Sequence, residues 1–139
     1  MGTTLWVLGK ANVGAGDSWD HSAMFDAADQ LDGMCDILAV PRLSGFFDWT
    51  DFNANLADEE LPGVEAPRER ASWFEARAAI PTLRALRTHI AEHPEAVSGI
   101  ASLGYENARE MLIEELDDCI AKVEALGSKG ERFHLCVVM

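Results

Sequence analysis

The feature that most constrains the fold of this chain is a series of carboxylates set one position after an apolar helical repeat. Between residues 11 and 67 there are twelve acidic residues and one base, Arg42. Apolar residues recur there at spacings of three or four, as on one face of an α-helix. They are Phe25, Ala28, Leu31, Cys35 and Leu38. About 100° further round the helix come Asp26, Asp29, Asp32 and Asp36. The segment is therefore predicted to be a helix with one face in the core and a neighbouring face of carboxylates, ending before Pro41.

The charge of this stretch restricts the partners of the protein. Residues 11–67 carry a net charge of −11, out of −13 for the whole chain. Such a field repels nucleic acid and anionic membranes, and it attracts basic proteins or cations. No apolar run approaches the ~18 residues of a membrane span. We therefore expect a basic protein partner, and neither nucleic acid nor a membrane.

Length and composition indicate one domain, residues 1–139. The chain is 48% hydrophobic and 25% charged, the balance of a globular protein. Its length allows a core without metal or disulfides. Cys35, Cys119 and Cys136 are scattered and odd in number, which favours reduced thiols. The first ten residues lack the basic and long apolar regions of a secretory signal. A cytoplasmic protein without a cofactor is the expectation.

Further apolar repeats predict two more helices. The apolar positions of the first are Ile80, Leu83, Leu86 and Ile90. Pro81 is expected in its first turn and Pro94 beyond its end. The second runs from about residue 105 to residue 126 and is stopped by Gly127. Residues 68–93 carry a net charge of +2. They are expected to complement the acidic helix, within the chain or across a dimer.

Each end of the chain predicts a strand. Residues 3–8 are β-branched and apolar and end at Gly9. Residues 132–139 place apolar side chains on both faces, as in a strand buried on both faces. The predicted fold is α+β, with three main helices flanking a small sheet formed by the N- and C-terminal strands. Because so small a sheet cannot protect its edges, we also expect a homodimer in which the sheet is extended or covered across a two-fold axis.

Two short motifs match known signatures. The run from His89 to His93, with Glu92 between them, fits H-x-x-E-H and resembles the zinc-binding helix of inverzincin peptidases. Pro94 follows at once, so two imidazoles near a helix C-terminus are the favoured interpretation. Residues 136–139 fit a C-a-a-X box and resemble the farnesylated tails of small GTPases. The residues before Cys136 are predicted to form a strand, which favours a structural role for residues 136–139.

A divalent-metal site is a second hypothesis. Carboxylates and an imidazole are ligands that Mg²⁺, Mn²⁺ or Ca²⁺ accept in proteins. The candidates are Asp17, Asp20 and His21, joined by Asp48 and Asp51. A small metal-dependent hydrolase built on them is the alternative function. Helix-capping aspartates on a solvated face are the favoured interpretation, because Asp is a preferred N-cap.

Aromatic residues gather beside acids in residues 46–52, and a core-filling loop is the favoured interpretation. If the segment is split, Phe46 and Phe52 are predicted to point inward and Trp49 outward. Aromatics next to carboxylates can anchor a basic partner. The leading hypothesis is an acidic interaction protein, a regulator or an inhibitor in the style of bacterial immunity proteins, rather than an enzyme. A homodimer with a structural role is a further alternative. The predicted partner-binding residues are Asp26, Asp29, Asp36, Phe47, Asp48, Trp49, Asp51, Asp58 and Glu59.

Overall fold

The computed structural model describes residues 4–9, 21–49, 72–97 and 107–138. The strands are β1 (Thr4–Gly9), β2 (Phe47–Asp48), β3 (Phe74–Glu75) and β4 (Arg132–Val138). The α-helices are α1 (Ser22–Asp26), α2 (Ala28–Leu38), α4 (Ala76–Glu92) and α6 (Ala108–Ser128). The 3₁₀ turns are η2 (Leu43–Phe46) and η4 (Pro94–Val97). The fold is α+β, as predicted.

The sheet is organised around β4. β1 pairs with it antiparallel along one edge, from Thr4 opposite Val138 to Gly9 opposite Phe133. This confirms the predicted pairing of the two terminal strands. β2 pairs in parallel with β4 and β3 pairs with it antiparallel. Because β1 occupies one edge of β4, β2 and β3 share the other. These two short strands were not predicted.

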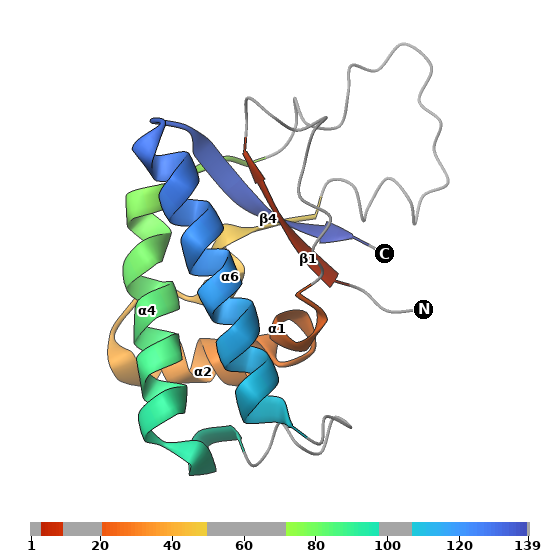
Figure 1. Cartoon of the computed structure of the whole chain (residues 1–139), viewed down its shortest axis with the longest axis vertical. Coiled ribbons are helices and arrows are strands. Elements are labelled where there is room, and N and C mark those ends of the chain that lie inside the picture. Colours follow the sequence, from red (N-terminus) through yellow and green to blue (C-terminus); the bar gives the residue numbers. More distant parts are fainter. Residues whose placement is uncertain (1–3, 10–20, 50–71, 98–106, 139) are drawn as a thin grey trace.

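The helices lie on one face of the sheet. Figure 1 shows α4 and α6 side by side and antiparallel, with α1 and α2 at one end of the pair. The predicted alternation of side chains along β4 is confirmed, because every second side chain packs into the same core as the helices. The sheet residues of that core are Leu5, Val7, Phe133, Leu135 and Val137. On the opposite face His134 and Cys136 are also buried, and Trp73 stacks on His134 with ring centroids 4.0 Å apart.

Three helix boundaries differ from the prediction. The first amphipathic segment forms two helices, α1 and α2, separated at Ala27. Pro81 lies inside α4, because the helix begins five residues earlier, at Ala76. α6 continues through Gly127, and Gly130 takes the left-handed turn with φ +72°. A Cβ on Gly127 would lie 2.8 Å from the Ala76 Cβ, so this glycine permits close packing of α6 on α4 instead of stopping the helix.

Two further features of the described part bear on the expectations. All three cysteines are buried and unbridged, and burial raises the pKa of the Cys35 thiol. Cys136 lies within β4, which supports a structural strand over a lipidation tail. In the ranges that the structure covers, none of the helices has the length and apolar character needed to cross a membrane.

Candidate interaction surface

The outward face of α2 is centred on Gly33. On a helix the neighbours of a residue are those three and four positions away. For Gly33 these are Asp29, Gln30, Asp36 and Ile37, and all five residues are exposed. Ile37 is 79% exposed, the highest value among the large hydrophobic residues that the structure describes as exposed. The opposite face holds Leu31, Met34 and Cys35 in the core, which confirms the predicted amphipathic helix.

The acids of this surface receive little internal compensation. The Arg42 guanidinium donates two hydrogen bonds to the Asp36 carboxylate, at 2.7 and 3.0 Å, and this holds the pKa of Asp36 below its usual range. Both partners are more than half exposed. Asp32 accepts hydrogen bonds from the backbone N–H and the hydroxyl of Ser44. Asp32 therefore positions η2, while Asp29 has no ion pair with any residue of the described ranges.

The arginines of α4 are engaged elsewhere. Arg84 pairs with Glu124 and Arg87 pairs with Asp117, both on α6. Arg77 pairs with its neighbour Glu75. The described part of the basic segment thus complements acids within the chain. These acids lie on α6 and not on the acidic helix α2, so the predicted partner of the basic segment was wrong.

The aromatic segment divides between core and surface. Phe46 is buried and Trp49 is 41% exposed, as predicted. The Trp49 ring contacts Phe25 of α1 and Phe47, with centroids 5.9 and 6.4 Å apart. Phe47 and Asp48, both predicted on the binding surface, are only 7% and 5% exposed. β2 pairing holds them inside, and Asp48 accepts a hydrogen bond from the Ser72 N–H at 2.8 Å.

Several predicted site residues lie outside the described ranges. They are Asp17, Asp20, Asp51, Asp58 and Glu59. Asp26 is described and exposed at the end of α1, next to Phe25. The described part of the predicted surface therefore consists of Asp26, Asp29, Asp36 and Trp49. The structure adds Ile37, which was not predicted, to this surface.

His21, predicted as a metal ligand, is buried and fully hydrogen-bonded. Its Nδ1 lies 2.8 Å from the Leu5 carbonyl oxygen, so it must donate its proton there. Its Nε2 lies 2.8 Å from Asp118 Oδ2, which also pairs with the Lys122 ammonium at 2.8 Å. Both ring nitrogens therefore lie within hydrogen-bond distance of an oxygen of the chain, and neither is free to bind a metal. His21 instead ties β1 to α6.

Glu115 belongs to the same contact between α1 and α6. Its carboxylate accepts the backbone N–H of Met24 at 2.9 Å and that of Ala23 at 3.3 Å. These donors sit in the first turn of α1, where no intrahelical acceptor exists. Burial raises the pKa of Glu115, an effect partly offset by these two hydrogen bonds and by His21. Glu115 therefore caps α1 from a distant helix.

The H-x-x-E-H residues lie at the exposed end of α4. The rings of His89 and His93 face each other with centroids 4.8 Å apart, and His93 also meets Glu95 at 3.2 Å. Pro94 starts η4 directly after the helix, as expected. Glu92 is exposed and does not join them in a ligand set. Across the described ranges, no three His, Cys, Asp or Glu side chains are grouped to hold a metal ion.

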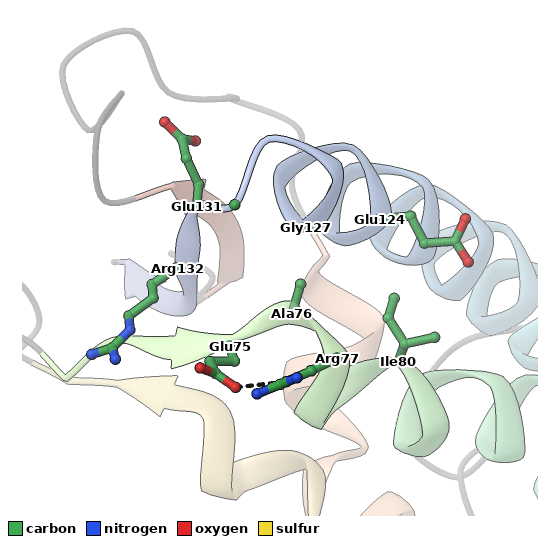
Figure 2. Close-up of a pocket in the computed structure, with 9 residues that line it drawn as sticks. Glu75, Ala76, Arg77, Ile80, Glu124, Gly127, Glu131 and Arg132 are labelled. Carbon is green, nitrogen blue, oxygen red and sulfur yellow. Dashed lines mark hydrogen bonds and ion pairs between the residues drawn. The ribbon is translucent and has the colours of Figure 1, made fainter.

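A pocket of about 480 Å³ lies between the start of α4 and the end of α6. Figure 2 shows Glu75 and Arg77 joined on one side of it, with Glu124 across it on α6. Arg132 and Glu131 complete its charged lining. Ligand pockets are usually apolar with a few polar groups, whereas acids and bases make up much of this lining and Glu75 pairs with Arg77. The pocket offers no defined ligand chemistry, so α2 is the stronger candidate site.

Comparison with known proteins identifies no relative. No family model, no curated protein and no solved structure matches this chain.

Proposed function

We propose that this protein is an acidic interaction module that binds a basic protein partner through α2 and through Trp49, whose ring contacts Phe25 of α1. One observation supports the proposal most. Among the described residues, the base that pairs with an exposed carboxylate of α2 is the exposed Arg42, while Arg84 and Arg87 of α4 pair with α6. A regulator or an inhibitor in the style of an immunity protein fits this arrangement. Attraction between opposite charges would speed association and select against acidic partners.

The test compares charge reversal on two acidic helices. Asp29→Lys on α2 is combined with Asp26→Lys at the adjacent end of α1 (the α2 variant), and Glu110→Lys combined with Glu114→Lys is the matched control on α6. Each protein is used to capture partners from native lysate at low and high salt. We expect one basic partner to be retained by the wild type and the α6 control, lost by the α2 variant, and released by salt as screening increases. Retention by the α2 variant, or indifference to salt, would refute the proposal.

The homodimer stays a prediction. β1 lies at an edge of the sheet, but its Leu5 carbonyl already accepts hydrogen bonds from the His21 backbone and ring. Strand pairing across a two-fold axis is therefore blocked at Leu5, and a dimer would cover the sheet instead of extending it. Sedimentation should give twice the 15.2 kDa mass of the chain. A stable monomer at micromolar concentration would contradict the dimer.

A further inference from the structure

We infer that the partner presents a basic amphipathic α-helix, and that this helix crosses α2 at Gly33. This inference rests on the proposed function and specifies the part of the partner that is bound. The first support is Gly33 itself. A glycine inside a helix costs about 1 kcal/mol relative to alanine, and a Cβ at this position would meet no atom of the described residues within 4 Å. Packing among the described residues gives no reason for the missing side chain.

A glycine at the centre of an exposed helical face creates a notch. The side chains around it rise from the turns before and after, at Asp29, Gln30, Asp36 and Ile37. A second helix can approach such a site more closely, because the distance between helix axes depends on the side chains at the crossing point. Gly127 allows the same close approach of two helices inside this protein, where α6 packs against Ala76 of α4.

The surroundings of the notch define the chemistry of the occupant. Ile37 is 79% exposed and would be covered by an apolar residue of the partner. Asp29 flanks the notch on the other side and calls for Lys or Arg, next to Asp36, which is already paired with Arg42. An α-helix has no free backbone edge to which a strand could add, so strand addition is not available here. A helix with one apolar stripe bordered by bases satisfies both requirements.

The experiment uses a synthetic leucine–lysine peptide patterned as an amphipathic helix, and a scrambled peptide of the same composition. Binding to the full chain is measured by calorimetry at low salt. The helical peptide should bind at least about tenfold more tightly than the scrambled one, equivalent to about 1.4 kcal/mol. Ile37→Ser and Gly33→Leu should each abolish that preference. Ala121→Leu, on the exposed face of α6, is the control for adding the same side chain to a helix surface and should leave it unchanged.

The outcomes separate this inference from the proposed function. If both peptides bind equally and Asp29→Lys weakens both, the helix inference is refuted while the acidic interaction surface stands. If neither peptide binds, the helix inference is refuted, while the proposed function is decided by the capture experiment. If Gly33→Leu binds the helical peptide as well as the wild type does, the crossing at Gly33 is refuted. Circular dichroism of each variant must show the wild-type helix content, and the open space around Gly33 predicts that it will.

Discussion

α2 and α6 are both acidic helices, but their carboxylates have different structural roles. On α6, Glu115 caps α1, Asp118 holds His21 and Lys122, and Asp117 and Glu124 meet arginines of α4. On α2, Asp36 meets a single exposed arginine from the following loop. Both helices pack against α4, so proximity is not the difference. What differs is that Arg84 and Arg87 of α4 form their ion pairs with α6. An acid-rich pattern therefore does not by itself reveal a binding surface.

The substitution with the largest expected effect on stability removes the Glu115 side chain. Glu115→Ala leaves the Ala23 and Met24 N–H groups buried without an acceptor, and it also leaves a cavity. We expect a loss of about 3 kcal/mol in the free energy of unfolding, measured with urea. Glu114→Ala, one position away and exposed, should change it by less than about 0.5 kcal/mol. Equal effects of the two substitutions would show that the carboxylates of α6 are interchangeable.

A pH series isolates the charge of Glu115. Because its pKa is raised in the folded protein, its stabilising contribution is present in full below the ordinary Glu pKa of about 4.3 and is lost as pH rises through the folded value. Glu115→Gln stays neutral and keeps an oxygen that accepts the Met24 N–H. The variant should therefore gain stability relative to the wild type between pH 4 and pH 8. A difference that does not change with pH would contradict the raised pKa.

Much of the fold follows from periodicity in the sequence. The alternation in residues 132–138 and the short apolar run at residues 4–9 are enough to predict two strands, and their pairing follows from the absence of other long strands. β2 and β3 could not be predicted, because two residues cannot show an alternation. The helix stop was placed at Gly127 instead of Gly130, since sequence does not distinguish a glycine needed for close packing from one needed for its φ.

The site could be predicted only in part. The acidic face of α2 follows from spacing alone. The partner of His21 lies 97 positions away in the chain, and the α4–α6 ion pairs span 30 and 40 positions, so no local pattern reports them. In the sequence nothing distinguishes Asp48 from an exposed acid, and its place in β2 buries it. Gly33 did carry a signal, because a glycine amid a strong helical repeat is unexpected.

A smaller effect is expected at the centre of the α2 surface. Gly33→Ala adds a methyl group into open space on a helical backbone. It should raise the free energy of unfolding by about 0.5–1 kcal/mol, because alanine loses less backbone entropy on folding. Thermal and urea unfolding would measure the gain. A loss of stability would mean that the space around Gly33 is filled within this protein, and that the notch is internal.

The smallest expected changes in stability come from single substitutions that compare a carboxylate of α6 with one of α2. Asp117→Asn removes one member of the exposed pair with Arg87 and should cost about 0.2–1 kcal/mol at low salt, decreasing as salt is raised. Asp29→Asn has no ion pair to break in the described structure, and it relieves repulsion from Asp26, Asp32 and Asp36 on neighbouring turns. Its stability should equal or slightly exceed that of the wild type, with binding of a basic peptide reduced. If Asp29→Asn were instead the more destabilising of the two, the carboxylates of α2 would be structural, and the contrast on which the proposed binding surface rests would not hold.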